Sequence, residues 1–128
     1  MYSDQLFISY KNSMKLKELG FSDECFRWWP HENLLSEDPL HLVYKDDYEF
    51  CFCPLYDQAF LFLFRKFGLH HEIFWDVDDK CFKFSIVEID GSGEAWDIDI
   101  NPEITLNYNN PFDIKDIILT EMIDYISK

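Results

Sequence analysis

The sequence is short of glycine, proline and basic residues. Its 128 residues include 4 Gly and 5 Pro, which leaves little room for linkers or low-complexity segments, and no segment is repeated. A chain of this length commonly forms one domain, so we expect residues 1–128 to fold as a single domain with its own core.

Long apolar stretches are missing too. The longest purely apolar run, Ala59–Phe64, falls far short of the roughly 20 residues that a membrane-spanning helix needs. The start of the chain, Met1–Gln5, lacks the features of a signal peptide. We therefore expect a cytoplasmic protein that does not bind membranes.

The 4 Cys are expected to stay reduced, because a chain of this size needs no disulfide to be stable. Cys51 and Cys53 lie two residues apart on a predicted strand, and His70 and His71 follow downstream. Thiols and imidazoles are zinc ligands, but two thiols at this spacing on a strand lie too far apart for one tetrahedral ion. We expect no metal and no cofactor.

Acidic residues outnumber basic ones by 25 to 11, which gives a formal net charge of -14 at pH 7. Chains with this balance are often disordered, but 13 Phe, 7 Tyr and 4 Trp supply enough apolar surface for a core. The charge argues against direct binding to nucleic acid or to anionic membranes. It favours a basic protein as the partner.

The first half of the chain predicts one helix and three strands. Apolar spacing predicts the helix over Asn12–Leu19, with Gly20 as its C-cap glycine. Cys25–Trp29 is typical of a strand that ends at Pro30. Two apolar segments flank a polar turn and predict a hairpin: Leu40–Tyr44 and Tyr48–Phe52.

A second helix is predicted over Leu55–Phe67, with Pro54 at its start and Gly68 as its C-cap. Its buried stripe comprises Ala59, Phe60, Leu63, Phe64 and Phe67. Leu61 and Phe62 make the helix apolar nearly all round, so we take Leu61 and Phe62 as a candidate homodimer interface.

Three further strands are predicted next. His71–Trp75 and Cys81–Ile89 pair across a polar turn, and Ala95–Ile100 returns after a second turn at 90–94. Apolar positions change parity within Cys81–Ile89, which requires a bulge near Ile86–Val87 if one face stays buried. On the returning strand three residues are expected to face the core: Trp96, Ile98 and Ile100.

The last helix is predicted to begin at Pro111, with Asn110 as its N-cap. Its apolar stripe comprises Ile114, Ile117, Ile118, Met122 and Tyr125. The expected fold class is therefore α+β: a two-layer sandwich in which a mostly antiparallel sheet of five to seven strands carries two main helices on one face.

The acids gather in one segment, since residues 84–114 hold seven acids and neither Lys nor Arg. Six of them are candidate partner-binding residues: Glu88, Asp90, Glu94, Asp97, Asp99 and Glu103. Asp97 and Asp99 project from the same side of a strand, and a second row with Glu88 and Asp90 would approach the charge density of a nucleic acid. This pattern predicts a surface that binds a basic protein, for which a mimic of nucleic acid is one form. Alternatively, the acids only keep an aromatic-rich protein soluble.

No motif indicates a reaction. The chain lacks Gly-x-Ser-x-Gly, and Gly91–Gly93 is typical of a hairpin turn. We identify no catalytic residue and expect a non-catalytic binding protein. A homodimeric structural or accessory protein is the second hypothesis, and a small enzyme of unknown reaction is the third.

Three segments, Leu16–Phe26, Cys53–Phe60 and Phe64–His70, resemble a group of uncharacterised small proteins carried on prophages and mobile elements of gut bacteria. The shared features are a Lys-Glu-x-Gly-Phe opening followed by Cys, and a helix start of the form Pro-x-Tyr-x-Gln-Ala. The resemblance implies an α/β sandwich and a mobile-element context, which makes a modulator of a basic host protein the expected role. It implies no activity.

Overall fold

The computed structural model describes residues 6–23, 25–31, 34–37, 48–100 and 111–128. The described residues form three helices and six strands, which confirms the α+β class. In chain order these are α1 (Tyr10–Glu18), β1 (Arg27–His31), β2 (Leu34–Ser36), β3 (Cys51–Cys53), α3 (Tyr56–Phe67), β4 (Leu69–Asp76), β5 (Cys81–Ile89), β6 (Ala95–Asp97) and α4 (Pro111–Ile126). The described strands form two three-stranded antiparallel sheets, where we expected one larger sheet.

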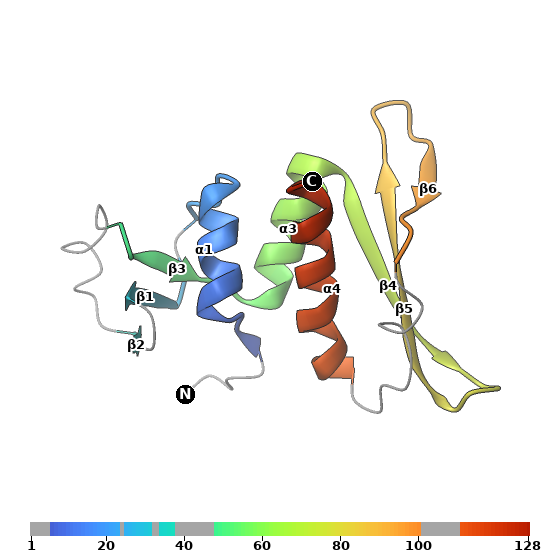
Figure 1. Ribbon diagram of the computed structural model, residues 1–128, viewed down its shortest axis with the longest axis horizontal. Helices are drawn as coiled ribbons and strands as arrows, with labels where there is room; N and C mark the ends of the chain where they lie inside the picture. The colour runs from blue at the N-terminus through green and yellow to red at the C-terminus, as the bar shows by residue number, and fades with distance from the viewer. Residues whose placement is uncertain (1–5, 24, 32–33, 38–47, 101–110) are drawn as a thin grey trace. The chain divides into compact units, whose positions relative to one another are not determined.

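The chain divides into two compact units, residues 1–59 and 60–128. In the first unit α1 packs against β3 of the sheet β2-β1-β3 (Figure 1). The N-cap Ser9 accepts a hydrogen bond from the backbone N–H of Asn12. At the other end, Gly20 has φ +104 and Phe21 N–H donates to Leu16 O at 2.9 Å. This is the expected C-terminal glycine motif.

Strand β1 differs from its prediction, because it begins at Arg27 and contains Pro30. Pairing with β3 runs only from Arg27 to Trp29, so Pro30 lies beyond that ladder. On the other side the register with β2 shifts between Trp28 and His31. A proline without an N–H is tolerated at such an irregular position. The predicted strand Leu40–Tyr44 lies outside the described residues.

Helix α3 ends at Phe67 as predicted, and Gly68 follows as its C-cap, with a φ of +72 and an N–H group that donates to Phe64 O at 2.9 Å. Its first turn is closed by Gln58 Oε1, which accepts from Leu55 N–H. Ala59, Phe60 and Leu63 are buried as expected. The assignment of Phe64 to the buried stripe was wrong, because its side chain is 45% exposed.

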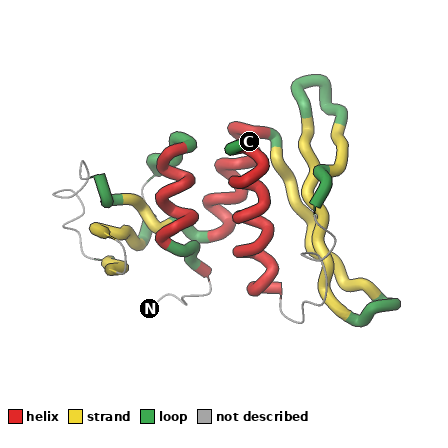
Figure 2. The backbone as a smooth tube through the Cα atoms, viewed as in Figure 1, coloured by secondary structure: helices red, strands yellow, loops and turns green. Residues whose placement is uncertain are grey.

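The second unit contains the sheet β4-β5-β6, with α4 packed against β4 and β5 (Figures 1 and 2). The β4–β5 register is continuous from Leu69↔Glu88 to Asp76↔Cys81, so the expected bulge at Ile86–Val87 was wrong. Helix α4 begins at Pro111 as predicted. Its buried residues are Ile114, Ile118, Leu119, Met122 and Ile123.

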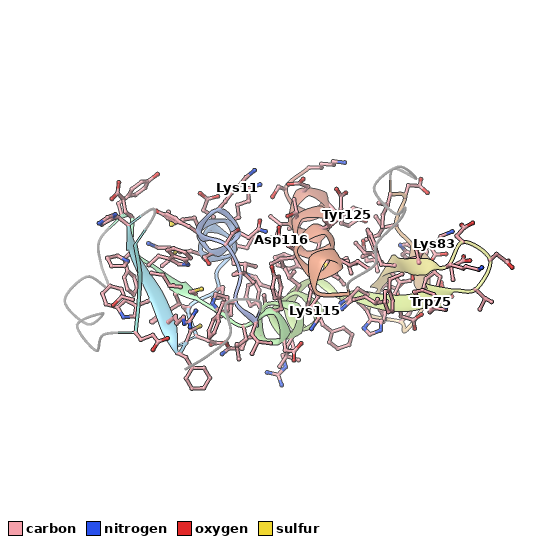
Figure 3. The ribbon with its side chains drawn as sticks, turned by 90° about the horizontal axis from the view of Figure 1, so that it is seen from below. Lys11, Trp75, Lys83, Lys115, Asp116 and Tyr125 are labelled. Carbon is pink, nitrogen blue, oxygen red and sulfur yellow. The ribbon has the colours of Figure 1, made fainter. Side chains whose placement is uncertain are left out.

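A polar turn joins β4 to β5, as expected. Asp76 Oδ1 accepts from the backbone N–H groups of Asp78 and Asp79, and Lys83 Nζ lies 3.2 Å from Asp76 Oδ2. These bonds, the one from Asp79 N–H first, lower the pKa of Asp76. Trp75 and Lys83 lie towards the turn end of this hairpin (Figure 3).

Candidate functional site

The acidic hairpin formed by β5, β6 and their connecting turn holds four of the six candidate acids, Asp99 follows β6, and Glu103 lies outside the described residues. Asp90 has a structural role there. Its Oδ1 accepts from Ser92 Oγ at 2.6 Å, from Ser92 N–H at 2.9 Å and from Glu94 N–H at 3.1 Å. These hydrogen bonds, the one from the Ser92 hydroxyl foremost, lower the pKa of Asp90. The Asp90 carboxylate therefore builds the turn.

Glu88 and Asp97 lie on opposite faces of the sheet. The register pairs Val87 with Asp97 and Glu88 with Trp96, and directly paired residues share a face. The expected double row, with Glu88 beside Asp97, was therefore wrong. Without that row the hairpin lacks the charge density that favoured a mimic of nucleic acid.

Besides Glu88, three described carboxylates are candidates for contact with a partner: Glu94, Asp97 and Asp99, hereafter the outer acids. All three are exposed. Within the described part of the chain none of their carboxylates forms an ion pair or hydrogen bond. Residues 84–100 contain no Lys or Arg that would neutralise them locally.

Glu88 has a partner that sequence reasoning missed. Tyr125 Oη on α4 donates a hydrogen bond to Glu88 Oε2, and this bond to a carboxylate raises the pKa of Tyr125. We had placed Tyr125 in the apolar stripe of its helix, but its side chain is 39% exposed. Trp96, which we expected to face the core, is 48% exposed. No signal in the sequence pairs these distant residues.

The candidate interface on α3 is exposed only in part. Leu61 is 47% exposed, whereas Phe62 is half-buried and packs edge-on against Phe67, with ring centroids 6.2 Å apart. Phe64, one turn after Leu61, is the second exposed apolar residue of this face. The apolar surface of α3 is thus centred on Leu61 and Phe64.

Three thiols are buried: Cys51, Cys53 and Cys81. Burial raises the pKa of Cys51 to about 12 and that of Cys53 to about 11. Cys25 is half-buried, and desolvation raises its pKa to about 12. Thiols with such pKa values are poor nucleophiles at neutral pH. Among the described residues, no three His, Cys, Asp or Glu side chains form a group that could hold a metal ion.

Comparisons with protein-family models, curated proteins and solved structures each find no match for this chain. The resemblance to mobile-element proteins therefore stays a prediction. None of the helices formed by the described residues has both the length and the apolar character needed to cross a bilayer.

Proposed function

We propose that this chain is a non-catalytic binding protein that binds a basic protein through the outer acids. One observation carries the proposal: Glu94, Asp97 and Asp99, which lie just before, in and just after the edge strand β6, are exposed and have no cationic partner among the described residues. An unneutralised cluster on a chain of net charge -14 attracts basic surfaces and accelerates their association.

The test is affinity capture from cells of the source organism with wild type and the Asp97→Asn/Asp99→Asn variant. Exposed ion pairs contribute about 0.2–1 kcal/mol each, so losing two should weaken binding roughly twofold to thirtyfold. Binding should also weaken as salt rises from about 0.1 M to about 1 M, where the Debye length falls from about 10 Å to about 3 Å. The measurement is the abundance of a basic protein in the captured fraction.

The matched control is Glu18→Gln/Asp78→Asn, which removes the same number of charges from exposed positions elsewhere. It should capture the basic protein as wild type does. Equal capture by the outer-acid variant and wild type would contradict the proposal, as would capture that does not respond to salt.

A second candidate function is a homodimeric accessory protein, which the exposure of Leu61 and Phe64 favours. Like charges oppose association of two such acidic chains, so this dimer should strengthen with salt, opposite to binding by the outer acids. Sedimentation velocity should then give a dimer that Leu61→Ser/Phe64→Ser converts to monomer. The control Val77→Ser, at a residue 76% exposed, should leave it intact. A monomer at every concentration excludes this function.

We further propose a cytoplasmic location, a mobile-element context and a two-layer sandwich. Unpaired buried thiols support the location, because a reducing compartment leaves such cysteines unpaired. The sequence resemblance supports the context and a role as modulator of a host protein. The packing of α1 on β3, and of α4 on β4 and β5, supports the two-layer arrangement.

A further inference from the structure

A groove in the second unit is lined by residues near the ends of α3 and α4 and at the start of β4. Figure 1 shows where these elements end and begin. Its volume is about 490 Å³, and it is lined by Phe67, Leu69, Glu88, Tyr125, Ile126 and Lys128. Leu69 is buried, and Phe67 and Ile126 are half-buried. The lining therefore combines three apolar side chains and a phenol with one carboxylate and one ammonium group.

The carboxylate of Glu88 is held in place. Tyr125 Oη donates to Glu88 Oε2, while Oε1 makes no hydrogen bond with any described residue. A carboxylate that is oriented through one oxygen presents the other to an incoming donor at little further cost in side-chain entropy. Lys128 lines the same groove but forms no ion pair with Glu88 in the described part of the chain.

An aromatic side chain flanks this carboxylate. Leu69, Glu88 and Trp96 form one row across β4, β5 and β6, because the register pairs Leu69 with Glu88 and Glu88 with Trp96. Paired side chains share a face with Cβ atoms about 5 Å apart, so Trp96 stands beside Glu88. Its ring is 48% exposed, and β6 is an edge of the described sheet.

We propose that this groove receives an arginine side chain of the basic partner. The proposal rests on the proposed function and names the recognition element within it. A guanidinium group stacks on an indole face and donates two parallel N–H groups to a carboxylate, whereas the aliphatic stem packs on apolar side chains. Trp96, Glu88 and the apolar lining supply these three contacts. An arginine side chain that enters at the β6 edge reaches Glu88 on β5 by crossing one strand spacing, about 4.8 Å.

The negative charge of Glu88 and the position of the groove near the β6 edge favour arginine over other side chains. Glu88 would repel an anion, and a purely apolar side chain would cover Glu88 Oε1 without donating a hydrogen bond to it. Lysine would lose the planar stacking and the paired hydrogen bonds. Asp97 lies in β6 on the face opposite to Glu88, and Asp99 follows β6, so a partner that straddles this edge strand engages both the groove and those acids.

The test titrates isotope-labelled protein with the peptide acetyl-Gly-Arg-Gly-amide and follows the Trp96 indole N–H and the Glu88 amide by NMR. The counterpart with citrulline, a neutral analogue of arginine, should bind on the order of tenfold more weakly. Trp75 is 51% exposed and pairs edge-on with Phe82, so its indole is an internal control that should not shift. An unmoved Trp96, or equal binding of both peptides, overturns the proposal.

Variants locate the contact. Glu88→Gln keeps an oxygen that accepts from Tyr125, so the fold should persist while peptide binding falls on the order of tenfold. Trp96→Ala, at a half-exposed position, should weaken binding as well. Lys128→Met should strengthen it by about twofold, since it removes a competing cation. Wild-type affinity in both Glu88→Gln and Trp96→Ala overturns the assignment.

Failure here is distinguishable from failure of the proposed function. The proposed function fails if the Asp97→Asn/Asp99→Asn variant still captures the basic protein as wild type does. The groove assignment fails if that variant loses capture but Glu88→Gln retains it.

Discussion

Gly68→Ala is expected to lower the free energy of unfolding by roughly 2–5 kcal/mol, a large share of the stability of a small protein. A Cβ at this position would lie 2.3 Å from the carbonyl oxygen of Ile89. That oxygen cannot move aside easily, because Ile89 N–H donates to Gly68 O at 2.8 Å. The φ of +72 adds about 1–2 kcal/mol for any residue with a side chain. Chemical denaturation followed by circular dichroism measures the loss.

Two glycines of the acidic hairpin separate the cost of the steric clash at Gly68 from the cost of its positive φ. Gly93 also has a positive φ, +86, but an added Cβ would have no atom within 4 Å, so Gly93→Ala should cost only about 1 kcal/mol. Gly91 likewise has open space around it and should tolerate alanine at close to no cost. If Gly68→Ala costs no more than Gly93→Ala, the contact with Ile89 does not constrain the fold.

Local signals explain the parts of the fold that were predicted. Gly20 and Gly68 end helices because they adopt positive φ, and Pro111 begins α4 because a first-turn residue needs no N–H donor. The bounds Cys81–Ile89 of β5 also agree with the prediction. These features depend on a few neighbouring residues, so they can be read from the sequence.

Tertiary context explains what was missed. Phe64 and Trp96 carry apolar side chains in regular elements, yet they are 45% and 48% exposed. The periodicity of apolar residues shows which face of an element is apolar, but not whether another element covers that face. The hydrogen bond from Tyr125 to Glu88 joins residues 37 positions apart. Likewise, the face on which each acid lies depends on the β5–β6 register. The sequence therefore predicts which segment holds the candidate acids, but not how their side chains are arranged in space.

The second large effect is expected at Arg27, which is buried in the first unit although no pattern in the sequence marks it. Its guanidinium lies 4.2 Å from the centroid of the Phe7 ring, and its Nε donates to Glu37 Oε1 at 2.7 Å. Arg27→Ala removes the cation–π contact and leaves a cavity, so we expect a loss of about 2–4 kcal/mol on denaturation.

Two further variants separate packing from charge at Arg27. Met fills similar space without a charge, and the Glu37 carboxylate that loses its partner is 50% exposed and stays hydrated, so Arg27→Met should lie within about 1 kcal/mol of wild type. Glu37→Gln keeps an acceptor for the Arg27 Nε–H group but removes the negative charge beside the buried guanidinium. It should cost roughly 1–2 kcal/mol, since the Glu37 side chain is 50% exposed and its charge is already screened. If Arg27→Met costs as much as Arg27→Ala, the guanidinium stabilises the unit through its charge and hydrogen bonds, and packing on Phe7 is the lesser contribution.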